Sequence, residues 1–389
     1  MFMKKYYFLF LILYGIPLLA VAQTYQAGKT YLSTNDYIEY RAGNLPIIIT
    51  APHGGRLEPT TIPDRACDTC TTVMDANTLE LSYEIDTALR QAFGCFPHII
   101  VNRLHRKKLD ANREIREAAL GNPVSEQAWR AFHQYVQTAK DSILKRNGRG
   151  ILLDMHGHGH TIQRLELGYM LSAASTRLSD SVLNTPTYTN QLSIKNLVKN
   201  NLTNAASAQL LRGDFALGTL FENEGFPAVP SKQQPQVNSG DSYFSGGYIT
   251  ARHGSSDSTT VDAIQIECHL TGVRDNVANR KLFASKLAQI LRGYLGRHYL
   301  RTLNFNCVTT VAAVENLDIK VYPNPFVDYL TIDNKGLDNR AVFIVDLLGR
   351  VVKGIDIQGN MKKEVDLSDM PKGIYFFKMD TYLIKIFKI

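Results

Sequence analysis

Three histidines occupy alternate positions in the stretch LLDMHGHGH, residues 152–160, where His156, His158 and His160 follow an apolar run and Asp154. The chain contains only ten histidines, so this density stands out. In an extended chain, alternate side chains lie on one face. The spacing therefore predicts His156 and His158 on a shared face with Asp154 beneath them. Imidazoles in this setting serve as metal ligands or as the base of a nucleophile.

Polar residues also follow three other short, β-branched runs, at 45–50, 98–102 and 262–267, besides the run at 150–155. Such non-alternating runs are typical of strands buried on both faces of a parallel sheet. The residues that follow or close them are His53; Arg103, Arg106, Asp110, Asn112 and Arg113; Asp154, His156 and His158; and Glu267. Parallel strands present their carboxyl ends at one edge, which predicts a single polar site.

This set of residue types matches the needs of metal-assisted hydrolysis. Neutral imidazoles and a carboxylate bind zinc and leave a position for water. A separate carboxylate takes and returns the proton. Arginines hold a substrate carboxylate by paired hydrogen bonds. Zinc is the preferred cofactor, although manganese or iron accepts the same ligands.

Helical patterns separate the runs and must position these residues. Apolar residues recur at helical spacing in 76–93, in 125–146 after a candidate N-cap at Ser125, and in 276–296. Strands alternating with helices predict a three-layer α/β/α fold with a mostly parallel sheet, of the phosphorylase/hydrolase-like kind. Residues 188–260 are rich in Asn, Ser, Gly and Pro and are expected to form long loops and short strands over the sheet edge.

The composition changes near residue 305. Period-two alternation between turn residues predicts a small all-β sandwich at 317–389, after a linker at 306–316. Its motifs YPNP (322–325), DLLGR (346–350) and GIY (373–375), with Lys385 and Lys388 near the end, resemble the C-terminal sorting domain of type IX secretion cargo. That resemblance implies export across the outer membrane by the type IX machinery.

The amino-terminal 22 residues have two lysines, an apolar run and Ala20-Val21-Ala22, the pattern of a signal peptide. No later segment is apolar for long enough to predict a membrane anchor. The formal net charge of +7 comes without a long basic run, so nucleic acid is not an expected partner. The mature protein is expected to be secreted or held at the cell surface.

Cys67 and Cys70 are spaced to close a small disulfide loop, and with five cysteines at least one thiol is free or paired elsewhere. No second CxxC pair accompanies them, so structural zinc is not expected at this loop.

Residues 23–305 resemble the N-formylglutamate amidohydrolase family, related to zinc carboxypeptidases. The matching stretches are APHGG (51–55), NRLHRKKLDANRE (102–114), LLDMHGHGH (152–160), YFSGGYITARHG (243–254) and IQIECHLTGVR (264–274). The resemblance implies that His53 and His156 are metal ligands and that Glu267 is the general base. It also implies that Asn112 and Arg113 bind a substrate carboxylate. Further residues expected to face the substrate are Arg103, Arg106, His158 and His253.

One departure affects the third metal ligand. Zinc carboxypeptidases take two ligands from H-x-x-E, but the third position after His53 is Arg56. Asp75, before the first helix, is the favoured replacement, and Glu58 is the reserve.

The predicted function is therefore an exported zinc-dependent amidohydrolase that acts on a small N-acyl amino acid or a peptide. Two alternatives remain open at this stage: a peptidoglycan amide or peptide hydrolase, and a non-catalytic surface binding protein on a hydrolase scaffold.

Overall fold

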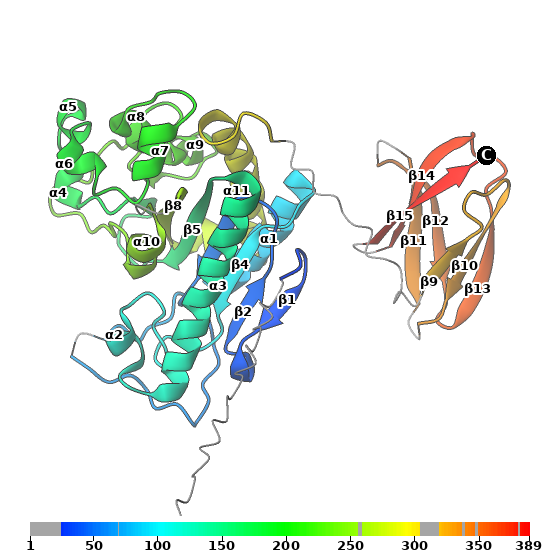
Figure 1. The fold of residues 1–389 in the computed structure, drawn as a ribbon, viewed down its shortest axis with the longest axis horizontal. Coiled ribbons are helices and arrows are strands. Elements are labelled where there is room, and N and C mark those ends of the chain that lie inside the picture. Colours follow the sequence, from blue (N-terminus) through cyan, green and yellow to red (C-terminus); the bar gives the residue numbers. More distant parts are fainter. Residues whose placement is uncertain are drawn as a thin grey trace, which may run out of the picture. The chain divides into compact units, whose positions relative to one another are not determined.

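The computed structural model describes residues 25–389 apart from 69, 256–258, 304–318, 337–338, 347–348 and 380–381. The chain divides into two compact units, Met1–Phe305 and Asn306–Ile389, which are described separately (Figure 1). The predicted signal peptide at 1–22 and linker at 306–316 lie outside the described residues. The boundaries drawn there stay predictions.

The first unit is built on one eight-stranded sheet. Its strands, in spatial order, are β1 (Thr30–Leu32), β2 (Ile38–Arg41), β4 (His98–Asn102), β3 (Ile47–Ala51), β5 (Gly150–Gly157), β8 (Val261–Cys268), β6 (Leu165–Gly168) and β7 (Ala228–Val229). The four neighbours β4, β3, β5 and β8 are parallel to one another. These are the four strands predicted from the sequence, and they form the centre of the sheet. Antiparallel pairing of β2 with β4 and of β6 with β8 makes the whole sheet mixed.

Three long helices cover the sheet: α1 (Thr78–Phe93), α3 (Pro123–Asn147) and α11 (Val277–His298). Apolar residues of α3 share one core cluster with Ile48, Ile100 and Leu152 from the strands. The alternate strand residues, among them Ile49 and Ile99, are also fully buried, and α1 packs on β3, β4 and β5 and against α11. Helices thus cover both faces, which confirms the α/β/α layers.

The start of α3 differs from the sequence-based expectation. Asn122, not Ser125, is the N-cap, and its side chain accepts hydrogen bonds from the N–H groups of Val124 and Ser125. Pro123 fills the first helical position, where a missing N–H costs nothing. The Ser125 hydroxyl donates instead to the carbonyl of Lys108.

Residues 173–253 hold more helix than expected. Short helices there are α4 (Ala173–Thr176), α5 (Asp180–Leu183), α6 (Pro186–Thr189), α7 (Lys195–Asn200), α8 (Ser207–Arg212), α9 (Leu217–Asn223) and α10 (Tyr248–His253). The prediction of loops and short strands over 188–260 was therefore wrong for α7, α8, α9 and α10. Each helix is too short to show a clear period, and packing of residues such as Leu211, Leu217 and Phe221 stabilises them. A further short helix, α2 (Ile115–Ala119), precedes α3.

The second unit is all-β, as predicted. A three-stranded sheet has the order β13 (Met361–Asp366), β10 (Tyr329–Asn334), β9 (Ile319–Tyr322). A four-stranded sheet has the order β12 (Val351–Ile357), β11 (Arg340–Val345), β14 (Gly373–Met379), β15 (Tyr382–Lys388). Their alternate apolar residues, including Ile332, Ile344 and Phe377, form one shared core.

Candidate metal centre

The predicted residues meet at the carboxyl edge of the parallel strands. His53 follows β3, His156 lies near the end of β5, and Glu267 lies near the end of β8. His156 and Glu267 are direct neighbours in the β5–β8 register. Asp75 reaches the same place from the loop before α1, where its N–H donates to the carbonyl of His53.

Both histidines face one oxygen of Asp75. His53 Nδ1 lies 3.2 Å and His156 Nδ1 lies 3.3 Å from Asp75 Oδ2. The ring centroids are 4.8 Å apart, and the three residues are almost fully buried. Two imidazole nitrogens and one carboxylate oxygen therefore converge on one small volume, which is the arrangement of a three-ligand metal site.

The second nitrogen of each ring is held by a different carboxylate. His53 Nε2 lies 2.6 Å from Asp110 Oδ1, and His156 Nε2 lies 2.8 Å from Asp154 Oδ2. A carboxylate only accepts, so each Nε2 donates its proton to the carboxylate behind it, which leaves Nδ1 as the ring nitrogen that would bind a metal in place of a proton. Carboxylates behind ligating histidines fix the tautomer and orientation in this way.

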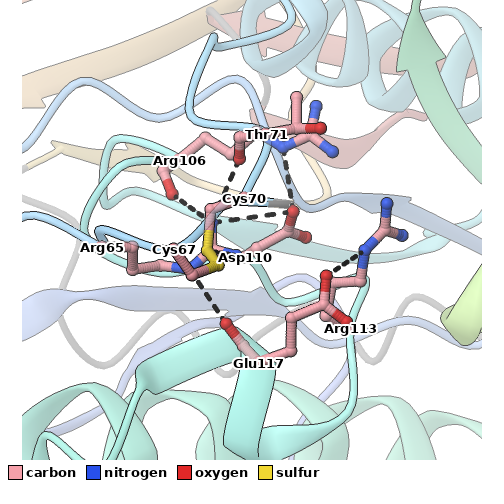
Figure 2. Close-up of a disulfide and its surroundings, with 8 residues drawn as sticks. All are labelled: Arg65, Cys67, Cys70, Thr71, Arg106, Asp110, Arg113 and Glu117. Carbon is pink, nitrogen blue, oxygen red and sulfur yellow. Dashed lines mark hydrogen bonds and ion pairs between the residues drawn. A yellow bond between two sulfur atoms is a disulfide. The ribbon is translucent and has the colours of Figure 1, made fainter.

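Two buried arginines, Arg106 and Arg65, lie against the carboxylates of Asp75 and Asp110. Arg106 Nε donates to Asp110 Oδ2 at 3.0 Å, and its Nη1 donates to Asp75 Oδ1 at 3.3 Å. Arg65 Nη1 lies 3.8 Å from Asp110 Oδ2. Figure 2 shows Arg65 beside both Asp110 and the disulfide that joins Cys67 to Cys70. The disulfide closes the loop predicted for it, and Cys268 is a free, buried thiol.

The electrostatics of the group favour a positive charge between the rings. Burial opposes ionisation of Asp75, yet the facing rings of His53 and His156 hold its pKa well below the ordinary range. Burial also disfavours the charged form of His156, but Asp154, Asp75 and Glu267 raise its pKa well above the ordinary value. A cation bound at the Nδ1 atoms would replace the proton that the chain alone stabilises there.

Glu267 is next to the group without being part of it. Its Oε1 lies 4.0 Å from His156 Nδ1 and accepts a hydrogen bond from Gln265 Nε2 at 2.9 Å. Burial, opposed by His156 and assisted by Asp75, Glu166 and Asp154, raises the pKa of Glu267 to about 8. Its Oε2 is buried and makes no hydrogen bond within the described part of the chain. A carboxylate with a raised pKa and a free oxygen suits proton transfer near neutral pH.

The two candidates for the third ligand have different surroundings. Asp75 faces both histidines, whereas Glu58 is exposed and lies 2.7 Å from Lys107. Asp75 also does not cap α1, because Asn77 holds the N-cap position. Its carboxylate contacts the histidines and Arg106 and accepts the N–H of Gly157 at Oδ2, at 3.1 Å.

The residues predicted to bind substrate are engaged elsewhere in this structure. Arg103 donates to the backbone of Asp36, and Arg113 Nε lies 3.0 Å from Glu117. Arg106 supports Asp75 and Asp110, as described above. Asn112 is close to the group, with its Nδ2 3.4 Å from His156 Nε2, but its Oδ1 accepts the N–H of Ile249.

The remaining histidines form two other groups. His253 is buried, and its Nε2 lies 2.8 Å from His133 Nδ1. His158 Nε2 donates to the carbonyl of Arg164. The side chain of His160 is mostly buried, and its Nδ1 lies 2.9 Å from Glu166 Oε1.

Sequence reasoning missed part of this arrangement. Asp110 and Asp154 were noted, but not as partners of His53 and His156. The signal for Asp154 was present, because a residue two positions before His156 on a strand shares its face. Arg65 and Gln265 carried no recognisable motif. Arg65 lies in an irregular loop, and Gln265 only gains meaning from its contact with Glu267.

Comparison with known proteins identifies one part of the chain. Residues 320–388 match the family described as the secretion system C-terminal sorting domain. The second unit is therefore a type IX sorting domain, and the chain is exported to the cell surface or the medium. This confirms the resemblance drawn from the sequence. Among the described residues, no helix is long and apolar enough to cross a bilayer.

The first unit has structural relatives at low similarity, and no curated protein matches the chain. N-formylglutamate amidohydrolase from Ralstonia eutropha JMP134 is 11% identical with a TM-score of 0.39, over 66% of this chain and 98% of that one. Succinylglutamate desuccinylase from Chromobacterium violaceum is 12% identical with a TM-score of 0.29, over 77% of this chain and 86% of that one. The first is of the family expected from the sequence. At these scores neither structure assigns an activity to this chain.

Proposed function

We propose that the exported chain is a metal-dependent amidohydrolase that cleaves an amide bond in an N-acyl amino acid or a peptide. The observation that carries this proposal is the pairing of ring nitrogens. His53 and His156 direct Nδ1 at a shared oxygen of Asp75, while each Nε2 is held by its own carboxylate.

The residues fit zinc, which favours imidazole nitrogen and carboxylate oxygen in sets of three with one open position. A zinc ion in such a site polarises a carbonyl and makes water more acidic. His53, Asp75 and His156 would hold it. Asp110 and Asp154 keep the two rings in the ligating tautomer, and Arg106 offsets the charge of Asp75 and Asp110.

Glu267 is the proposed general base. It takes a proton from water that attacks the amide carbon, and it returns that proton to the leaving nitrogen. Gln265 holds Oε1 of the carboxylate, which leaves the buried Oε2 as the atom that carries the proton.

The test combines metal content with hydrolysis. The purified chain, loaded with zinc, is assayed against N-formyl, N-acetyl and peptide substrates. Glu267→Gln should keep its zinc and lose roughly 100-fold or more of the activity, as expected for removal of a general base. His156→Ala should lose both zinc and hydrolysis.

Glu39→Gln is the matched control, because Glu39 is a buried glutamate of the same sheet that contacts Arg41 and Tyr83 instead. This variant should hydrolyse normally. Full activity of Glu267→Gln or His156→Ala, or zinc-loaded wild-type protein that cleaves none of these substrates, would contradict the proposal.

A further inference from the structure

A second group of metal-binding side chains lies beside the first. His158, His160 and Glu166 each offer a ligand atom, and these atoms lie within 4.8 Å of one another. His158 and Glu166 are almost fully buried, and the side chain of His160 is about one-fifth exposed. The group is therefore buried on the side of His158 and Glu166 and is open to solvent at His160.

The hydrogen bonds of His158 prepare it as a ligand. Its Nε2 lies 2.8 Å from the carbonyl oxygen of Arg164, which only accepts, so Nε2 carries the proton. The lone pair of Nδ1 is directed toward His160, whose N–H reaches it at 3.2 Å. As at His53 and His156, Nε2 is held by an acceptor and Nδ1 is the nitrogen that would bind a cation, which here would replace the hydrogen bond from the His160 N–H.

Glu166 is a fully buried carboxylate that lacks a permanent cation. Its Oε1 lies 2.9 Å from His160 Nδ1, and its Oε2 accepts the N–H of Phe244 at 2.8 Å. In the antiparallel β6–β8 pair, Glu166 stands directly opposite Glu267, another buried carboxylate.

Neither of the nearby arginines, Arg164 and Arg274, forms an ion pair with Glu166. Arg274 donates to the backbone carbonyls of Ala76, His158 and Cys268, and Arg164 lies 3.5 Å from Asp241. Glu267 also retains a buried Oε2 that has no partner among residues the structure describes. A buried carboxylate beside two imidazoles, with no arginine or lysine paired to it among the described residues, favours a bound cation.

We propose that His158, His160 and Glu166 form a second divalent-cation site, separated from the His53–Asp75–His156 site by Glu267. Glu267 is paired in register with His156 on β5 and with Glu166 on β6, so it stands between the two groups. Two imidazoles and a carboxylate select zinc or a similar transition metal over calcium or magnesium. This inference does not depend on hydrolysis, since a chain that binds two cations and cleaves nothing would still satisfy it.

The experiment counts metal per chain. The purified protein is stripped with a chelator, dialysed against zinc chloride and then against metal-free buffer, and analysed by inductively coupled plasma mass spectrometry. Wild type should retain about two zinc ions, as two sites of three protein ligands each imply. His160→Ala and the isosteric Glu166→Gln should each retain about one, and so should His156→Ala.

His105→Ala serves as the matched control. His105 is also a partly exposed histidine close to a glutamate, with its Nε2 3.9 Å from Glu58, but it lies outside both groups. This variant should keep the wild-type zinc content. Circular dichroism of each variant establishes that it is folded.

The outcomes separate this inference from the proposed function. If wild type holds one zinc ion that His156→Ala loses and His160→Ala keeps, the second site is refuted and the first stands. If the one ion is lost in His160→Ala and kept in His156→Ala, the second site stands and the proposed catalytic centre is refuted. Equal zinc content in wild type and in both second-site variants also refutes the second site.

Discussion

The two units of this chain use β-sheets in opposite ways. In the first unit, five carboxylates are buried near the carboxyl ends of the strands: Asp75, Asp110, Asp154, Glu166 and Glu267. In the second unit the buried faces are apolar, and its buried polar residues among those described are Asp333, Asn334 and Lys388. The first unit thus buries a group of carboxylates at one edge of its sheet, whereas the core between the two sheets of the second unit is apolar.

The difference follows from strand direction. Parallel strands deliver their carboxyl ends, and the loops that follow them, to one edge, where residues distant in sequence meet. Antiparallel strands alternate in direction, so consecutive loops lie at opposite ends and a two-sheet sandwich buries only its inner faces. We therefore expect changes in the first unit to impair metal binding and hydrolysis. Changes in the second unit should impair export.

Removal of residues 320–388 should have the largest effect. Without the sorting domain, the chain should fail to reach the cell surface or the medium almost completely. The truncated chain should still bind zinc with unchanged affinity, since all proposed ligands lie in the first unit. Cell fractionation with immunoblotting, together with zinc titration of the purified truncated chain, tests both statements. Normal export of the truncated chain, or loss of its zinc binding, would contradict the separate roles proposed for the two units.

The carboxylates behind the ligand histidines should matter next. Asp110→Asn and Asp154→Asn should each weaken zinc affinity by roughly 10-fold to 100-fold, because each removes the carboxylate that holds Nε2 of His53 or His156 and so orients the ring. The matched change in the sandwich is Asp333→Asn, at a buried aspartate that lies 3.7 Å from Lys362. It should leave zinc affinity unchanged. Competition with a chromophoric chelator measures all three, and equal affinities would contradict the role given to Asp110 and Asp154.

Close backbone packing beside the site gives a third contrast. A Cβ on Gly55 would lie 2.3 Å from the backbone carbon of Arg103, whereas a Cβ on Gly354 would meet only the Phe343 ring at 3.6 Å. Gly55→Ala should therefore destabilise its unit by roughly 1–3 kcal/mol through overpacking. Gly354→Ala should stay within about 0.5 kcal/mol of wild type. Thermal unfolding followed by circular dichroism would refute this contrast if the two variants were equally stable.

A buried histidine should make the first unit acid-sensitive. Burial, assisted by the charge of Arg146, lowers the pKa of His98 to about 3; its Nδ1 accepts from the Gly43 N–H and lies 2.9 Å from the Tyr40 hydroxyl. The unfolded chain takes up this proton near pH 6.5 and the folded chain does not. Stability is thus fully present above pH 6.5 and is lost as pH falls toward 3.

Relative to wild type, His98→Leu should reduce the slope of unfolding free energy against pH, between about 6 and 4, by roughly 1 kcal/mol for each pH unit. Denaturant titrations of metal-free protein at several pH values measure this slope. An unchanged slope would show that His98 does not contribute to acid sensitivity.

The sequence predicted the centre of the fold because the four inner strands are β-branched and bounded by polar residues. Their parallel arrangement was enough to bring His53, His156 and Glu267 together. Asp75 was chosen from its place before a helix and from the family resemblance, and the structure places it between the histidines.

What the sequence could not predict depends on contacts between irregular segments. Arg65 approaches Asp110 from an irregular segment next to the disulfide that joins Cys67 to Cys70 (Figure 2). The opposition of Glu166 and Glu267 requires the short antiparallel strand β6, which has no strong pattern of its own. Arg113, expected to face the substrate, pairs with Glu117 one helical turn later.

The central claim is that Asp75 completes a metal site with His53 and His156. The most direct measurement is the zinc content of Asp75→Asn beside that of Glu58→Gln, after identical loading and dialysis. The account predicts that Asp75→Asn loses about one zinc ion per chain and that Glu58→Gln loses none. Full zinc content in Asp75→Asn, or its loss in Glu58→Gln alone, would contradict it.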